Sequence, residues 1–266
     1  MTKSVLLIGC GAIGREIIEK LSTETEICVN QILVRSRKKG SISHEISGDI
    51  HVIASINEVE PVPDFVMECA SHQAVAEFGP YFLSRGIDFG IISIGALSDP
   101  NLLEQLEVAA RNGGSQLVIV PGAIGGIDSL AAASVENLEE VIYTSRKPPL
   151  SWKGSTADKS YDLTKIDKPT IIFQGSAGVA AQLYPKNANV AATIALAGLG
   201  FDQTQVTLVA DPEVDNNTHQ FEARGSFGEL NVTISGNPLP RNRKSSALTA
   251  YSAVRMLKNR AQRVCI

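Results

Sequence analysis

Short apolar runs alternate with amphipathic stretches over the first 120 residues of the chain. Runs of roughly four to eight residues rich in valine and isoleucine are typical of buried strands, whereas apolar residues that recur every three to four positions indicate a helix. This pattern predicts strands at 5–8, 27–34, 50–56, 64–71, 88–94 and 116–120, and helices near 13–21, 72–83 and 102–112. Because strands and helices alternate, we expect a doubly wound parallel sheet.

The pattern changes after Pro121, where small residues and more closely spaced strands follow. Strands are predicted at 140–145, 170–174, 206–211, 219–227 and 230–234, and helices rich in small residues at 177–183 and 187–198. Strands with few helices between them favour an open sheet, mixed or antiparallel, with one exposed face. We interpret the polar stretch 150–168 as a loop, and Pro238 with Pro240 as a linker to a final amphipathic helix at 246–263.

The 266 residues therefore predict two domains of an α/β protein. The first domain comprises residues 1–120 together with 240–266, because the last helix is expected to pack back onto it. The second comprises residues 121–239 and carries the mixed or antiparallel open sheet.

A glycine-rich turn joins the first strand to the first helix. Gly9, Gly11 and Gly14 have the spacing G-x-G-x-x-G. The first glycine permits a tight turn, the second lets a pyrophosphate approach the backbone, and the third lets the helix pack closely on the sheet. Strand, turn and helix in this order favour a dinucleotide site in a Rossmann domain over an ordinary glycine turn. The expected cofactor contacts are Gly9, Cys10, Gly11, Ala12, Ile13 and Gly14.

The end of the second predicted strand bears on the choice between NAD and NADP. An acidic residue there commonly binds the ribose 2′-hydroxyl of NAD, but this chain has Val34 followed by Arg35. Arg35 is therefore a candidate ligand for the 2′-phosphate of NADP, although a solvated basic turn is the alternative. Ala70 and Ser71 end a later strand, so we expect them to border the nicotinamide side of the cofactor.

Composition excludes several other classes of function. The net charge is −4 and the basic residues form no long block, which argues against nucleic acid or an anionic membrane as a partner. No apolar run reaches the roughly 18 residues of a membrane span. The four cysteines form no C-x-x-C pair, which argues against a metal site and favours a reducing, cytoplasmic compartment. Neither G-x-S-x-G nor H-E-x-x-H occurs, so hydrolase chemistry has no support.

Two residues of the second half are candidates for chemistry. His219 is one of four histidines and follows a polar stretch between two predicted strands. An imidazole exchanges protons near neutral pH, so His219 is either a catalytic acid–base group or a turn residue. Lys147 precedes two prolines and is either a ligand for a substrate carboxylate or an ordinary surface lysine.

Six blocks of sequence together resemble the L-aspartate dehydrogenases of the NAD-biosynthesis type. The blocks are 8–14 (IGCGAIG), 68–71 (ECAS), 121–128 (PGAIGGID), 147–149 (KPP), 184–191 (YPKNANVA) and 209–219, which begins VADP and ends at the histidine. They occur in the family's order over nearly the whole chain. The glycine motif alone is generic, whereas the later blocks together are specific.

The resemblance implies NAD(P)-dependent oxidative deamination of L-aspartate, through iminoaspartate, to oxaloacetate and ammonia in a reversible reaction. His219 matches the family's catalytic histidine, and Ala123 and Asn189 match cofactor contacts. Lys147, Asn189 and His219 are then the expected substrate-binding residues. The resemblance also implies a homodimer formed through the second domain. The alternatives are a related oxidoreductase of the homoserine-dehydrogenase or dihydrodipicolinate-reductase type, or a non-catalytic NAD(P)-sensing protein.

Overall fold

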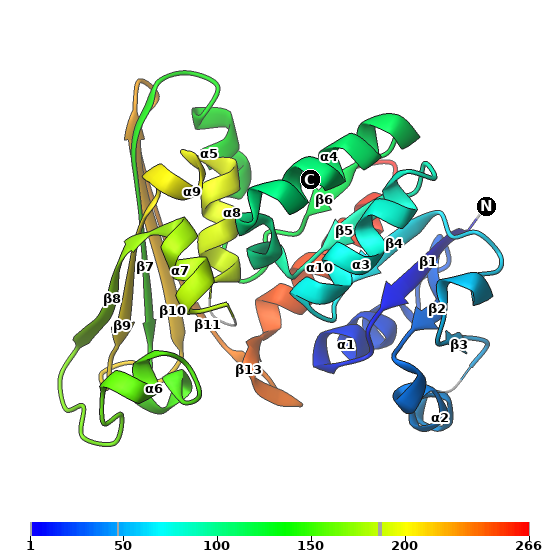
Figure 1. Ribbon diagram of the computed structural model, residues 1–266, viewed down its shortest axis with the longest axis horizontal. Coiled ribbons are helices and arrows are strands. Elements are labelled where there is room, and N and C mark those ends of the chain that lie inside the picture. The colour runs from blue at the N-terminus through cyan, green and yellow to red at the C-terminus, as the bar shows by residue number, and fades with distance from the viewer. Residues whose placement is uncertain (1, 47, 186–187, 266) are drawn as a thin grey trace. The chain divides into compact units, whose positions relative to one another are not determined.

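The computed structural model describes residues 2–46, 48–185 and 188–265. The chain divides into two compact units, Met1–Val120 with Ala250–Ile266, and Pro121–Thr249 (Figure 1). Lys186 and Asn187, which belong to one of the blocks of family resemblance, lie outside the described residues. No helix of the described residues has the length and apolar character needed to cross a membrane.

The first unit is built on a six-stranded parallel sheet with the order β3-β2-β1-β4-β5-β6. The strands are β1 (Lys3–Ile8), β2 (Ile27–Leu33), β3 (His51–Ile53), β4 (Phe65–Glu68), β5 (Asp88–Ile91) and β6 (Leu117–Ile119). The strand order reverses between β1 and β4, and ligands of such sheets bind beyond the carboxyl ends of the strands at this point. The prediction of a doubly wound Rossmann sheet is thus confirmed.

Helices cover both faces of this sheet (Figure 1). They are α1 (Ala12–Leu21), α2 (Ser36–Glu45), α3 (His72–Leu83), α4 (Pro100–Gly113) and the C-terminal α10 (Ala247–Asn259). Ile17 of α1 and Leu257 of α10 share one apolar core with Val5 and Leu7 of β1. Ser71 caps α3, where its hydroxyl accepts a hydrogen bond from the Ala74 backbone N–H at 3.3 Å.

Helix α2 was not predicted from the pattern. Its sequence, SRKKGSISHE, has little apolar periodicity, and Ile42 is its buried residue. The turn interpretation of this basic segment is therefore wrong, because one buried residue leaves almost no hydrophobic period to detect.

The second unit contains a five-stranded mixed sheet with the order β11-β10-β7-β9-β8. The strands are β7 (Leu138–Lys147), β8 (Thr170–Ser176), β9 (Gln205–Ala210), β10 (Asn217–Gly225) and β11 (Gly228–Gly236). β7 and β9 run parallel, and the other neighbours run antiparallel. The helices α5 (Ile127–Ala133), α7 (Ala177–Leu183), α8 (Asn189–Ala197) and α9 (Gly200–Gln203) lie on one side of this sheet (Figure 1). This confirms the second α/β domain with a mixed open sheet.

The segment 150–168 is more ordered than the loop predicted for it. It contains most of a 3₁₀ helix, η3 (Pro149–Trp152), and a short helix, α6 (Ala157–Ser160). Trp152 is completely buried, and its indole Nε1 donates to the Val209 carbonyl at 3.2 Å. A single tryptophan anchored on a distant strand holds this polar segment, which local pattern could not reveal. The predicted Pro238–Pro240 linker likewise contains β12 (Pro238–Leu239), paired with β13 (Asn242–Ser246).

Candidate active site

The glycine turn after β1 has the geometry of a phosphate-binding turn. Gly9 has a φ of +95°, and a Cβ there would lie 2.8 Å from the Ala70 Cβ. A Cβ on Gly14 would lie 2.8 Å from the Gly9 carbonyl oxygen. A Cβ on Gly11, by contrast, would meet no atom within 4 Å. Gly9 and Gly14 therefore permit the turn and its packing, and Gly11 leaves open space where a phosphate can approach the start of α1.

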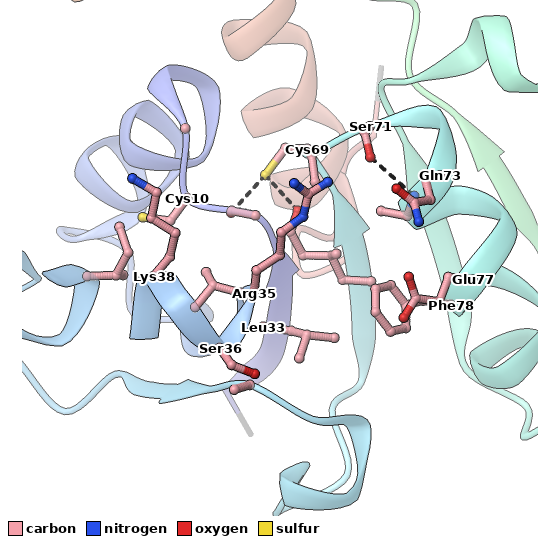
Figure 2. A pocket seen from close by; sticks show the side chains of 18 of the residues that line it. Cys10, Leu33, Arg35, Ser36, Lys38, Cys69, Ser71, Gln73, Glu77 and Phe78 are labelled. Carbon is pink, nitrogen blue, oxygen red and sulfur yellow. Dashed lines mark hydrogen bonds between the residues drawn. The ribbon is translucent and has the colours of Figure 1, made fainter. Parts of the chain in front are cut away.

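A cavity of about 750 Å³ opens beside this turn (Figure 2). This volume is within the range of small-molecule and cofactor sites. Residues from the glycine turn, the end of β2, α2, the end of β4 and α3 line it: Ile8, Gly9, Cys10, Gly11, Arg15, Leu33, Val34, Arg35, Ser36, Lys38, Ser41, Ile42, Glu45, Ala54, Cys69, Ala70, Ser71, Gln73, Ala74, Glu77 and Phe78. The open approach at Gly11 and the polar groups around the cavity fit a dinucleotide.

Six of the predicted cofactor contacts meet at this cavity, namely Gly9, Cys10, Gly11, Arg35, Ala70 and Ser71. Ala12, Ile13 and Gly14 do not line it, because they continue from the turn into α1. The thiol of Cys69 donates to the carbonyl of Gly9 at 3.2 Å (Figure 2). Burial raises the pKa of both Cys10 and Cys69, so it disfavours their thiolate forms, which are the nucleophilic ones.

The end of the cavity near β2 is basic. Arg35, Ser36 and Lys38 line it, and in Figure 2 the Arg35 side chain lies between those of Lys38 and Ser71. The carboxylate of Glu45 also lines the cavity, but it pairs with the guanidinium of Arg15. The pairing offsets the negative charge of Glu45 within the cavity lining. The sequence analysis did not assign Lys38 and Ser41 to the site because it did not predict α2, which places both at the cavity.

A buried carboxylate organises the strand ends that border the cavity. Glu68 is fully buried at the end of β4, and its Oε1 accepts from the Ala70 and Ser71 backbone N–H groups at 2.6 and 2.7 Å. Its Oε2 accepts from the Ile92 and Ser93 N–H groups at 3.3 and 3.1 Å, and the Ser93 hydroxyl donates to Oε1 at 2.9 Å. Burial raises the pKa of Glu68, and these donors oppose that shift. Glu68 thus joins the ends of β4 and β5.

We expect Glu68→Gln to destabilise the first unit. The amide nitrogen would face backbone N–H groups, so buried donors would lose their acceptor at a cost of about 3 kcal/mol. The melting temperature should fall by roughly 5–10 °C. Glu107→Gln, on the exposed side of α4, removes a charge from the same unit and should leave the melting temperature within about 1–2 °C. Equal melting temperatures for the two variants would contradict the role assigned to Glu68.

The second unit carries a row of buried polar groups on β7 and β10. Tyr143, Ser145 and Lys147 alternate along β7, so they share the face of the sheet. His219 of β10 is paired with Ser145 across the ladder, and it is 4% exposed. The interpretation of His219 as a turn residue is wrong, because it is the third residue of β10. Lys147 is 7% exposed, so it is not a surface lysine either.

His219 is held by Tyr143 and is close enough to Lys147 to respond to its charge. The Tyr143 hydroxyl lies 2.7 Å from His219 Nδ1, and the two rings stack with an interplanar angle of 11°. Burial, and then the Lys147 ammonium, lower the pKa of His219 to about 3, so its imidazole is neutral near pH 7. The sequence analysis did not identify Tyr143 as a site residue. Its spacing of two residues from Ser145 and four from Lys147 could have indicated that the three side chains share one face of a strand.

Lys147 lies in an apolar, aromatic environment. Its Nζ is 5.0 Å from the centroid of the Trp152 ring, which provides a cation–π contact. Burial lowers the pKa of Lys147 to about 8, so the ammonium form still predominates at pH 7. The Lys147 ammonium can bind an anionic group of a ligand. The neutral His219 imidazole can exchange a proton with a neighbouring atom of the same ligand.

Ala123 and Asn189 both belong to the second unit. Ala123 is buried in its apolar core, and Asn189 is half-buried at the start of α8. The Asn189 backbone carbonyl accepts from the Thr193 hydroxyl at 3.0 Å. Neither residue lines the cavity beside the glycine turn. Within the described ranges, no cluster of three or more histidine, cysteine or acidic side chains could hold a metal ion.

Two family models match the chain. The model for the C-terminal domain of aspartate dehydrogenase matches residues 128–260, which include β7, β10 and the buried polar row. The model for the NAD-binding domain of homoserine dehydrogenase matches residues 9–120, which include the glycine turn and its cavity. The two matches divide the chain near the boundary between the two units.

Full-length relatives and a solved structure agree with these matches. The chain is 46% identical to the L-aspartate dehydrogenase of Ralstonia nicotianae, covering 98% of this chain and 99% of that protein. It is also 46% identical to the L-aspartate dehydrogenase of Pseudomonas aeruginosa, covering 99% of both. A crystal structure of aspartate dehydrogenase from Thermotoga maritima has a TM-score of 0.80 and 29% identity over the full length of both chains. A hyperthermophilic archaeal homoserine dehydrogenase in complex with NADPH has a TM-score of 0.60 and 14% identity over 98% of each chain, a likeness of fold alone.

Proposed function

The chain belongs to the L-aspartate dehydrogenase family, and from this premise we propose that it catalyses the NAD(P)-dependent oxidation of L-aspartate. The products are oxaloacetate and ammonia, iminoaspartate is the intermediate, and the reaction is reversible. The observation that carries the proposal is the buried pair of His219 and Lys147 in the unit that matches the family's C-terminal domain. A dicarboxylate substrate needs a cation, and hydrolysis of an imine needs a group that moves a proton.

The cavity beside the glycine turn supplies the cofactor site in this proposal. The backbone around Gly11 would hold the pyrophosphate, and Arg35 would lie at the adenosine ribose. Ala70 and Ser71 would border the nicotinamide. When NAD(P)⁺ is bound, it supplies the acceptor for the hydride that leaves the substrate Cα.

Lys147 binds a carboxylate of the substrate in this proposal, and the Asn189 side chain provides a second polar contact. Pairing with a carboxylate offsets the ammonium charge that lowers the pKa of His219. Substrate binding therefore removes the smaller of the two causes that lower the pKa of His219, while burial, the larger cause, remains.

His219 then carries out the proton transfers of imine hydrolysis. Its ring accepts a proton from the water that attacks the imine carbon, which gives a carbinolamine. It returns that proton to the nitrogen and then accepts the hydroxyl proton of the carbinolamine as the C=O bond forms and the C–N bond breaks, so that ammonia leaves with oxaloacetate and the last proton passes from the ring to solvent. The overall reaction is L-aspartate, NAD(P)⁺ and water to oxaloacetate, ammonia, NAD(P)H and a proton.

Initial rates of NAD(P)H formation test the proposal. L-Aspartate should give the highest kcat/KM when compared with L-glutamate, L-asparagine and L-homoserine, each with NAD⁺ and with NADP⁺. A higher rate with L-homoserine would favour a homoserine-dehydrogenase type of reaction. Binding of NAD(P)H with no turnover of any amino or keto acid would favour the sensing protein. Either result would overturn the proposal.

We expect Arg35→Glu to change the coenzyme preference. A carboxylate in place of the guanidinium would repel the 2′-phosphate, so KM for NADP⁺ should rise roughly 10- to 100-fold. KM for NAD⁺, which has a hydroxyl there, should change less than about threefold. Arg37→Glu is the matched control, because Arg37 is exposed in the first turn of α2, two residues after Arg35, and does not line the cavity. Equal effects of Arg35→Glu on both coenzymes would contradict this role.

A homodimer in the cytoplasm completes the proposal. The helices of the second unit lie on one side of its sheet, so the other side offers a surface for a second copy of the chain (Figure 1). Ile171 of β8 is an apolar side chain that is 54% exposed. The four cysteines are free, in keeping with a reducing compartment. Light scattering should give about twice the chain mass of 28.3 kDa, and a monomer would contradict the dimer.

A further inference from the structure

We infer that Tyr143 is a positioning residue that holds the His219 ring and keeps a proton on Nδ1, so that Nε2 offers its lone pair to the substrate. The inference rests on the proposed function, because the proton transfers assigned to His219 set the direction of its hydrogen bond to Tyr143. The hydrogen bond itself, and the tautomer that it selects, belong to the resting protein and can be measured without substrate.

In this geometry, Nδ1 of His219 is hydrogen-bonded to Tyr143. The two side chains come from neighbouring strands, with His219 directly opposite Ser145 and Tyr143 directly opposite Phe221. The hydroxyl therefore reaches His219 diagonally across the ladder, and it does so at 2.7 Å. The ring centroids are 6.1 Å apart and nearly parallel. Tyr143 is fully buried and His219 is 4% exposed, so water has little access to compete for this hydrogen bond.

The direction of the hydrogen bond follows from the proton transfers. A neutral imidazole has one N–H, and the ring can accept a proton from water only at the nitrogen that lacks it. If Nδ1 carries the proton and donates it to Tyr143 Oη, Nε2 is the free base. When Nε2 takes up a proton, Nδ1 continues to donate to Oη. The hydrogen bond therefore needs no reversal between the neutral and the charged ring, which is the preorganisation that favours catalysis.

This arrangement requires another acceptor for the Tyr143 proton. Burial raises the pKa of Tyr143, so the phenol stays protonated, and the Ser145 hydroxyl exerts a smaller opposing effect on it. Ser145 is fully buried and is the next residue on the same side of β7. Its Oγ is thus the group in the row to which the phenol can direct its proton. The order Nδ1–H to Tyr143 Oη–H to Ser145 Oγ would provide a donor for the Ser145 hydroxyl oxygen, which is buried without a hydrogen-bond partner among the described residues of the resting structure.

The test uses protein labelled with ¹⁵N in the histidine rings. The chain has four histidines, so a spectrum of His219→Gln identifies the His219 signals by their loss. The wild-type spectrum should show the Nδ1–H tautomer for His219. Tyr143→Phe keeps the ring but removes the acceptor, so the spectrum should shift to the Nε2–H tautomer. Tyr184→Phe is the matched control, because the Tyr184 hydroxyl is also buried in this unit but donates to the Ile172 carbonyl; its His219 spectrum should match wild type.

Kinetics give the second readout. Tyr143→Phe should lower kcat for L-aspartate roughly 10- to 100-fold with little change in KM, because Lys147 still binds the carboxylate. Tyr184→Phe should keep kcat within about threefold. A wild-type Nε2–H tautomer, or a Tyr143→Phe variant that keeps both Nδ1–H and wild-type kcat, would overturn the inference.

Two outcomes separate this inference from the proposed function. If the wild-type protein does not oxidise L-aspartate, the proposed function fails, while the tautomer measured in the resting protein still decides the positioning role. If Tyr143→Phe does not fold, the wild-type spectrum alone decides the tautomer, since an Nε2–H ring is incompatible with the inferred hydrogen bond.

Discussion

His219→Gln is expected to lower kcat for L-aspartate by roughly 10²- to 10⁴-fold, which is the usual contribution of a positioned acid–base group. Glutamine has a similar size and can form hydrogen bonds, but its amide neither accepts nor releases a proton near neutral pH. The loss should therefore appear in kcat in both directions of the reaction. Initial rates with L-aspartate, and with oxaloacetate and ammonium, measure it.

Cofactor binding should remain intact in this variant. The cavity beside the glycine turn is formed by residues of the first unit, and His219 does not line it. Titration with NAD(P)H should give a Kd within about threefold of wild type. His51→Gln is the matched control, because His51 is an exposed histidine on β3, and it should keep wild-type rates. A His219→Gln enzyme with near-normal kcat would refute the assignment of His219 as the acid–base group.

Lys147→Met is expected to raise KM for L-aspartate roughly 30- to 100-fold. The substitution replaces a buried ammonium by an apolar chain of similar length, so a carboxylate would be buried without its counter-charge. The folded protein should not be destabilised, because exchanging a buried charge for an apolar side chain is often neutral or stabilising. A raised KM with an unchanged or higher melting temperature would separate substrate binding from folding.

The pH dependence of KM provides a second test of Lys147. Burial lowers its pKa to about 8, so the ammonium form is lost as the pH rises through this value. With ammonium saturating at each pH, KM for oxaloacetate should increase as the pH is raised beyond 8. Lys147→Arg retains its charge at high pH, so its KM should lack this rise even if the planar guanidinium fits less well. A wild-type KM that stays flat from pH 7 to 10 would contradict the binding role.

The sequence was sufficient to predict those elements whose stabilising contacts lie between neighbouring residues. Helix α3 was predicted with the bounds that the structure has, His72–Leu83, because its cap at Ser71 and its apolar spacing both lie within the segment. The turn at Gly9 was equally predictable, since a φ of +95° suits glycine and few other residues. These signals are properties of neighbouring residues and need no knowledge of the rest of the chain.

Signals that depend on distant partners were missed or misinterpreted. Trp152 anchors a polar segment through a carbonyl of β9, 57 residues away, so the stretch looked like an irregular loop. His219 was predicted as the first residue of a strand at 219–227, with a turn left open as the alternative; pairing with Ser145 of β7 excludes the turn, and β10 begins two residues earlier, at Asn217. Tyr143 has no unusual neighbours in sequence, and its hydrogen bond spans 76 residues.

The doubly wound sheet and its glycine turn for a dinucleotide could be predicted from consecutive residues alone, because the apolar period and the conformational freedom of glycine are local properties. The sequence also pointed to His219, Lys147 and Arg35 as the groups to consider. The shared burial of His219 and Lys147, and the contact of Tyr143 with the imidazole, become visible once the strands are paired in the fold. Burial and proximity to charge set the protonation of these groups, and both arise from strands that the fold brings together from distant parts of the chain.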